Sequence, residues 1–162
     1  MAARKKQPVE GDKAPEVDLP SDPDGRVRLS ALKGKTVVLY FYPKDDTAGC
    51  TKEAIDFSSA QKAFSRAGAV VVGVSRDNVA KHAKFREKHQ LTVSLASDED
   101  GKTIASYGSW VEKSLYGRKY MGVDRSTFLI DPAGVIRRIW RKVRVPGHVE
   151  EVLEAVRALK SG

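Results

Sequence analysis

The sequence of 162 residues contains one cysteine, Cys50, so no disulfide can form within the chain. It also lacks any hydrophobic run that approaches the roughly 20 apolar residues of a transmembrane helix. The basic residues at positions 4–6 are not followed by the apolar segment of a secretory signal. We therefore expect a cytoplasmic protein without a membrane span, whose lone thiol is either reactive or a small buried hydrophobe.

Hydrophobic residues make up 41% of the chain and charged residues 31%, which is ordinary for a folded protein. The length suits one domain, and we expect a flexible N-terminal tail over residues 1–8 and a single domain over residues 9–162. The net charge of +8 raises the possibility of nucleic-acid binding. However, the basic residues are dispersed and no zinc-finger or RNA-recognition signature accompanies them, so we expect no specific nucleic-acid partner.

Residues 36–53 carry the strongest local signal of the sequence. A run of β-branched and aromatic residues ends at Pro43, a polar loop follows, and a helical pattern then begins near Cys50. A thiol is nucleophilic only as a thiolate, and the free N–H groups of a helix's first turn favour negative charge there. Thr47 lies three residues upstream, within reach of the sulfur, and Pro43 can wall off a pocket without an unpaired N–H group.

Apolar periodicity and turn residues predict the remaining elements, which assemble into a mixed sheet flanked by helices. A strand, helix and strand in succession imply parallel strands with a right-handed crossover. Ser30 is expected to cap a short helical turn. The predicted elements are an N-terminal hairpin at 11–20 and 27–29, strands at 36–42, 69–74 and 93–96, helices at 50–67, 79–89 and 103–107, an antiparallel hairpin at 126–130 and 135–140, and a final helix at 148–159.

The pattern Pro-x-x-x-Thr-x-x-Cys, present as Pro43, Thr47 and Cys50 with Glu53 one turn later, resembles the active-site signature of the peroxiredoxins. These are thiol peroxidases of thioredoxin-like α/β fold. Residues 40–45, 50–54 and 116–131 resemble the bacterioferritin comigratory protein type, or Q type, of this family. The resemblance runs from about residue 9 to about residue 160.

The resemblance implies a role for each of five residues. Arg125 would lie against the peroxidatic sulfur, where a permanently charged fork of donors can hold a thiolate and polarise a peroxide oxygen. The Thr47 hydroxyl and the Cys50 N–H would bind the peroxide, Pro43 would shield the pocket, and Glu53 would orient the arginine. Hydrogen peroxide or an organic hydroperoxide would then be reduced, leaving a sulfenic acid. No metal or organic cofactor is implied.

The chain departs from the family where a second, resolving cysteine is usual. Ile55 stands five residues after Cys50, and the helix predicted at 79–89 contains no cysteine. We therefore expect an external thiol reductant, such as glutathione, another low-molecular-weight thiol, thioredoxin or glutaredoxin. A monomer is expected, with a Cys50-linked dimer possible on oxidation. Ala48 replaces a common proline, which we expect to loosen the loop slightly.

Two other classes of function stay open. The first is a peroxide sensor or thiol-based regulator, in which Cys50 oxidises without turnover. The second is a basic nucleic-acid or chaperone-like binding module, in which the cysteine is incidental.

The histidines and a group of aromatic residues are expected to be mainly structural. His82 and His89 are seven residues apart, too far for the i, i+4 spacing of a zinc helix, so we expect surface or capping positions. A structural role is also expected for His148. Trp110, Tyr116 and Tyr120 surround a predicted glycine-rich loop, and either line the peroxide entrance or pack in the core.

Overall fold

The computed structural model describes residues 7–161 and contains a seven-stranded mixed sheet. Its strands are β1 (Asp18–Asp22), β2 (Gly25–Arg28), β3 (Thr36–Phe41), β4 (Ala69–Ser75), β5 (Ser94–Ser97), β8 (Ser126–Ile130) and β9 (Ile136–Trp140), in the spatial order β2-β1-β5-β4-β3-β8-β9. β3 is parallel to β4, and β4 to β5, whereas the other pairs are antiparallel. The expected α/β class and both predicted hairpins are confirmed, although the first strand, predicted over residues 11–20, begins only at Asp18 and runs to Asp22.

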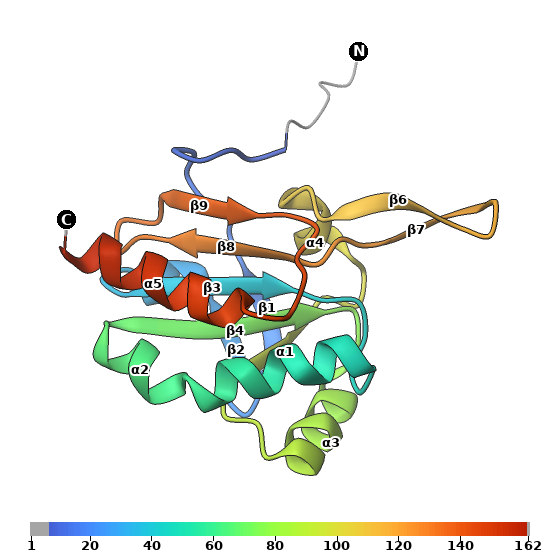
Figure 1. Ribbon diagram of the computed structural model, residues 1–162, viewed down its shortest axis with the longest axis horizontal. Coiled ribbons are helices and arrows are strands. Elements are labelled where there is room, and N and C mark those ends of the chain that lie inside the picture. Colours follow the sequence, from blue (N-terminus) through green and yellow to red (C-terminus); the bar gives the residue numbers. More distant parts are fainter. Residues whose placement is uncertain (1–6, 162) are drawn as a thin grey trace.

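Helices cover both faces of this sheet. The helices α1 (Ala48–Ser59), α2 (Gln61–Arg66), α3 (Val79–His89) and α5 (His148–Ser161) contribute to one hydrophobic cluster, and Figure 1 shows α1, α2 and α5 in front of the strands. On the other face, α4 (Lys102–Ser106) and the 3-10 helix η1 (Leu29–Leu32) contribute to a second cluster. The sheet is therefore buried on both sides, as a partly parallel sheet requires.

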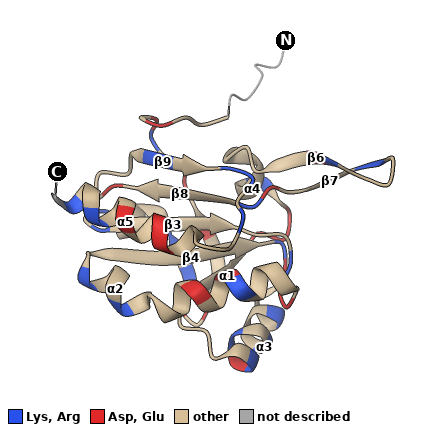
Figure 2. Cartoon of the chain, in the orientation of Figure 1, with Lys and Arg blue, Asp and Glu red and all other residues tan. Residues whose placement is uncertain are grey.

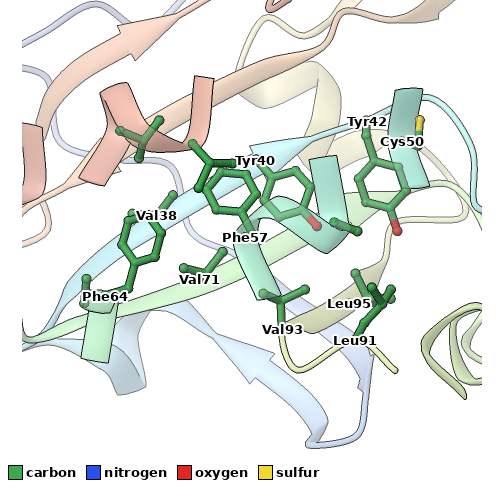
Figure 3. Close-up of a cluster of buried hydrophobic side chains, with 14 of the residues drawn as sticks. Val38, Tyr40, Tyr42, Cys50, Phe57, Phe64, Val71, Leu91, Val93 and Leu95 are labelled. Atoms are coloured by element: carbon green, nitrogen blue, oxygen red, sulfur yellow. The ribbon is translucent and has the colours of Figure 1, made fainter. Parts of the chain in front are cut away.

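Strand β3 leads to the site and is buried along its whole length. Val38 and Tyr40 belong to the cluster beneath the helices, whereas Leu39 and Phe41 belong to the opposite one. Successive side chains of a strand point to opposite faces, so a continuous apolar run is what a strand covered on both faces needs. Figure 3 shows Val38, Tyr40 and Tyr42 in a row that ends beside Cys50.

Two local helix predictions were wrong. The single helix expected over residues 50–67 is two helices, because Ala60 (φ −93°, ψ 3°) leaves the helical conformation between α1 and α2. Phe57 and Phe64 still pack in one cluster, with ring centroids 5.8 Å apart, which explains why the apolar spacing seemed continuous. Ser30 lies inside η1 rather than capping it, and its N–H donates to Glu16 Oε1 at 3.1 Å.

The expected loop before Arg125 is instead a two-stranded hairpin, formed by β6 (Trp110–Leu115) and β7 (Arg118–Val123). Figure 1 shows it projecting beyond the main sheet. Its turn places both Tyr116 (φ 52°) and Gly117 (φ 78°) in the left-handed region, as a two-residue type I′ turn does. The sequence shows neither the Asn-Gly pair that usually announces this turn nor apolar alternation, since much of the hairpin is exposed.

Most of the expected N-terminal tail, residues 1–6, lies outside the described residues. At its end, Pro8 is buried, and its carbonyl accepts a hydrogen bond from Arg141 Nη2 at 3.5 Å. Within residues 7–161, no helix is both long and apolar enough to cross a membrane. Figure 2 shows lysine and arginine spread over several helices and strands rather than gathered in one stripe.

Candidate active site

The loop after β3 directs the chain into α1. Thr47 is the N-cap residue of this helix, and its hydroxyl donates to the Lys44 carbonyl at 2.8 Å. The Thr51 N–H donates to the Thr47 carbonyl at 2.8 Å. The N–H groups of the residues between them, Cys50 included, therefore precede the first intrahelical bond and have no acceptor within the helix. Cys50 lies in the first turn, as the sequence predicts, although α1 begins two residues earlier.

A guanidinium group contacts the thiol. Arg125 directly precedes β8, and its Nη2 donates to Cys50 Sγ at 3.3 Å. Cys50 is 1% exposed, and the Arg125 side chain is 17% exposed. A Cβ added to Gly49 would lie 3.1 Å from Arg125 Nη2, so this glycine leaves the space that the guanidinium occupies. The sheet thus brings a cation from residue 125 to a thiol at residue 50.

Glu53 lies behind this pair, one helical turn after Cys50, and its side chain is fully enclosed. Its Oε1 accepts from Arg125 Nη1 at 2.8 Å. Burial outweighs the effect of Arg125 and raises the pKa of Glu53 to about 7. Burial by itself lowers the pKa of Arg125, but the neighbouring Glu53 and Cys50 raise it by more, so the guanidinium stays charged.

Pro43 and Thr47 are exposed residues of the segment that leads to the thiol. In the described part of the chain, neither side chain hydrogen-bonds to Cys50. The Thr47 hydroxyl donates its hydrogen bond to the Lys44 carbonyl, so its oxygen can accept a hydrogen bond from a ligand. The structure therefore joins Cys50 and Glu53 through Arg125, whereas Pro43 and Thr47 are exposed in the segment that precedes Cys50.

The AhpC/TSA family model matches residues 10–139. The chain is 50% identical over 143 residues to a putative peroxiredoxin Bcp of Coxiella burnetii, covering 88% of this chain and 95% of that one. It is 47% identical over 147 residues to the peroxiredoxin Bcp of Bacillus subtilis, covering 91% and 94%. The chain belongs to the AhpC/TSA family, as a peroxiredoxin of the Bcp type.

Solved structures of peroxiredoxins have the same fold. The bacterioferritin comigratory protein of Xanthomonas campestris matches with a TM-score of 0.85 at 40% identity, covering 89% of this chain and 92% of that one. BcpB of Mycobacterium tuberculosis matches with a TM-score of 0.81 at 36% identity, covering 93% and 97%. The expected thioredoxin-like fold and the family resemblance are thus confirmed.

A buried polar network beside the site of this peroxiredoxin was missed. His82 was expected at a surface or capping position, but it is fully buried, and its Nδ1 lies 2.7 Å from Asp45 Oδ2. Its Nε2 lies 3.0 Å from the Ala96 carbonyl oxygen, and the Tyr42 hydroxyl donates to Asp45 Oδ1 at 2.6 Å. The surface prediction was wrong because His82 precedes Phe85 by three residues, and the two share the buried face of α3. That spacing was the available signal.

A second contact joins the same helix to the same loop. Asp46, whose φ is 61°, accepts from Lys88 Nζ at 2.7 Å, and His89 Nε2 lies 2.9 Å from its other carboxylate oxygen. These hydrogen bonds lower the pKa of Asp46. Helix α3 therefore contacts two successive residues of the loop: Asp45 through buried hydrogen bonds and Asp46 through exposed ones.

The third histidine, His148, is buried. His148 Nε2 lies 2.8 Å from Thr127 Oγ1, and burial lowers the pKa of His148 to about 4, so its ring is neutral near pH 7. Over residues 7–161, no three His, Cys, Asp or Glu side chains are grouped as metal ligands would be.

Proposed function

We propose that Cys50 is the peroxidatic residue of this thiol-dependent peroxidase, held as a thiolate by Arg125. The observation that carries the proposal is the 3.3 Å contact between Arg125 Nη2 and Cys50 Sγ in a nearly closed site. A charge-assisted hydrogen bond in such a place stabilises an anion more than it would in water. The first turn of α1 adds partial positive charge at the same sulfur.

The same groups are suited to binding the peroxide. The Cys50 N–H and the Arg125 guanidinium supply donors, and the free lone pairs of Thr47 Oγ1 accept from the peroxide O–H. Donors preset where charge develops on the leaving oxygen lower the barrier to O–O cleavage. Pro43 is proposed to limit access of water to this pocket without presenting an N–H group.

In the first half-reaction, the Cys50 thiolate attacks one peroxide oxygen. An S–O bond forms as the O–O bond breaks, the leaving oxygen takes up a proton to become water or an alcohol, and Cys50 becomes a sulfenic acid. In the second, an external thiol attacks the sulfenic sulfur and displaces water, giving a mixed disulfide. A second external thiol then attacks the external sulfur of this mixed disulfide. Cys50 is released as a thiolate, and the two external thiols form a disulfide with each other.

The acceptance of organic hydroperoxides as well as hydrogen peroxide is proposed from a relative, since alkyl peroxide reduction is described for the Xanthomonas campestris protein, which is 40% identical. A groove of about 510 Å³ lies beside Pro43, but its lining includes the charged residues Arg76, Asp77 and Lys81 and does not include Cys50. Trp110 and Tyr120 line this groove, whereas Tyr116 is almost fully exposed at the turn.

An external reductant follows from the single cysteine. Solved variants of the Xanthomonas peroxiredoxin replace two different cysteines by serine, whereas this chain has only Cys50. We propose a low-molecular-weight thiol, thioredoxin or glutaredoxin as the reductant, a monomer as the working form, and the cytoplasm as its location.

Rapid mixing of reduced protein with hydrogen peroxide and an organic hydroperoxide, in the presence of a sulfenic-acid trap, tests this proposal. We expect stoichiometric trapping on Cys50 at a rate at least 100-fold above that of a free thiol, and none in Cys50→Ser. Oxidation no faster than that of a free thiol would contradict the proposed site.

A further inference from the structure

Two acidic groups share one cation at the bottom of the site. Arg125 donates from Nη2 to Cys50 Sγ at 3.3 Å and from Nη1 to Glu53 Oε1 at 2.8 Å. Glu53 Oε2 is also buried, and it has no hydrogen-bond partner among the described residues. An ionised carboxylate is destabilised when one of its oxygens is buried without a hydrogen bond, because no protein group replaces the water that this oxygen has lost.

Counting charges shows the consequence of this sharing. If Cys50 and Glu53 were both ionised, two negative charges would face one positive charge in a nearly closed site. An uncompensated buried charge is strongly unfavourable. The favoured arrangements carry one proton between the two acids, so that the three groups sum to zero charge.

The other groups that face Glu53 do not supply a second cation. Tyr40, from β3, has a buried hydroxyl with no partner in the described residues, and burial together with Glu53 raises its pKa, so it stays neutral. Asp56, on α1, adds negative charge and favours the protonated carboxyl. His148, at the start of α5, lies near Arg125 and is neutral near pH 7. Among the described residues whose charge acts on Glu53, Arg125 is therefore the one cation.

We propose that Glu53 stores the proton that Cys50 gives up, and releases it when the thiolate is oxidised. In the resting site, the thiolate, the guanidinium and a neutral Glu53 carboxyl coexist, with Oε1 still accepting from Arg125. After attack on the peroxide, the sulfenic acid is neutral, and Glu53 is ionised and paired with Arg125. The proton that it has lost balances the one gained by the leaving oxygen, so the site stays neutral throughout.

Glu53 acts on Cys50 through Arg125 and is thus a positioning residue. In addition, it carries a proton in the resting site. This role rests on the proposed function, since it presupposes that Cys50 forms a sulfenic acid. It differs from a fixed carboxylate that merely orients the arginine, because the two roles predict different exchanges of protons with the solvent.

Proton uptake during oxidation tests the inference. Reduced protein in weakly buffered solution at about pH 8 is mixed with hydrogen peroxide and a pH indicator. This pH lies above the Glu53 pKa of about 7 that burial and Arg125 set, so the carboxyl ionises once the neighbouring sulfur is neutral. Thiolate loss is followed in parallel by ultraviolet absorbance, and the sulfenic acid is trapped. We expect almost no proton uptake per thiolate lost in the unmodified protein, and about one in Glu53→Gln.

Glu154→Gln is the matched control, since it makes the same substitution at an exposed carboxylate of α5 that pairs with Arg157 at 3.1 Å. It is expected to behave as the unmodified protein. Uptake of one proton per thiolate in the unmodified protein would overturn the inference alone, as would the absence of uptake in Glu53→Gln. The absence of any sulfenic acid would instead overturn the proposed function, and the inference with it.

A second measurement does not depend on the folding of a variant. The infrared difference spectrum of the unmodified protein before and after oxidation is expected to lose one carboxylic-acid carbonyl band and gain one carboxylate band. A spectrum without that loss rules out a protonated Glu53 in the resting site.

Discussion

Gly49 matters because of the atom that a larger residue would meet. A methyl group at this position would lie 3.1 Å from Arg125 Nη2, closer than most contacts of a Cβ atom. Alanine itself suits a helix better than glycine, by up to about 1 kcal/mol. We expect Gly49→Ala to fold at least as stably as the unmodified protein but to react with peroxide roughly 10-fold more slowly. The added methyl group would push the guanidinium away from the sulfur, and a tenfold loss of rate corresponds to about 1.4 kcal/mol of lost interaction.

Rapid-mixing kinetics and thermal unfolding measure the two effects separately. Ala48→Gly, at an exposed neighbour in the same helical turn, serves as the control and is expected to lose stability rather than peroxide reactivity. An unchanged peroxide rate in Gly49→Ala would mean that Arg125 can move aside without losing the thiolate.

His148 makes the stability of the protein depend on pH. Burial lowers its folded-state pKa to about 4 from the ordinary value of 6.5. Between these values, the unfolded chain binds a proton that the folded protein does not, so the free energy of unfolding falls as pH falls from 6.5 to 4. The loss attributable to His148 is about 2 kcal/mol by pH 5, at about 1.4 kcal/mol per pH unit.

Urea unfolding of the unmodified protein and His148→Gln at pH 7 and about pH 5 measures this loss. Other titrating groups affect both proteins, so the difference between the two isolates His148. We expect the unmodified protein to lose about 2 kcal/mol more than the variant on acidification. Parallel pH dependences would show that His148 is not kept neutral by the fold.

At the scale of elements, α3 supports the loop that precedes the helix with the thiol. His82 joins this helix to Asp45 and to the Ala96 carbonyl of β5, all within the protein interior. Removing His82 leaves a buried carboxylate without one of its partners. We expect His82→Ala to lower the free energy of unfolding by about 3 kcal/mol.

The neighbouring exposed contact provides the comparison. His89→Ala removes a partner of Asp46, which Lys88 still holds, so its cost should stay within about 1 kcal/mol. Denaturant unfolding gives both values, and hydrogen exchange is expected to show faster opening of α3 in His82→Ala alone. Equal losses of stability in the two variants would contradict a larger contribution of the buried His82–Asp45 contact than of the exposed one.

At the scale of the whole molecule, the net charge of +8 acts on the second half-reaction more than on the first. Hydrogen peroxide is neutral, whereas many thiol reductants carry a carboxylate. Attraction between a basic surface and an anion weakens as salt shortens the screening length from about 10 Å at 0.1 M to about 3 Å at 1 M.

We therefore expect mercaptoacetate to reduce oxidised Cys50 several-fold more slowly at about 1 M than at about 0.1 M salt. Mercaptoethanol, of similar size but without the carboxylate, is the matched control, and its salt dependence should be smaller. Rate constants from single-turnover mixing check the difference, and identical salt dependences would argue against electrostatic attraction of the reductant.

Local patterns were most informative where chain neighbours decide the structure. The apolar run of β3, the helix over Val79–His89 and the hairpin β8–β9 were predictable from periodicity and turn residues. The break at Ala60 was not, since the apolar spacing continues across it. The β6–β7 hairpin was also missed, because its turn begins with Tyr116 and its faces are largely exposed.

The sequence by itself determined a single thiol in the first turn of a helix, a motif around it that marks the family, and the lack of a second cysteine. These follow from composition and short-range spacing. Tertiary structure decided which charges meet: the antiparallel pairing of β3 with β8 brings Arg125 to Cys50 and Glu53 from more than 70 residues away. Burial, which depends on every packed element at once, then decided that His82 lies inside and that Glu53 shares its cation.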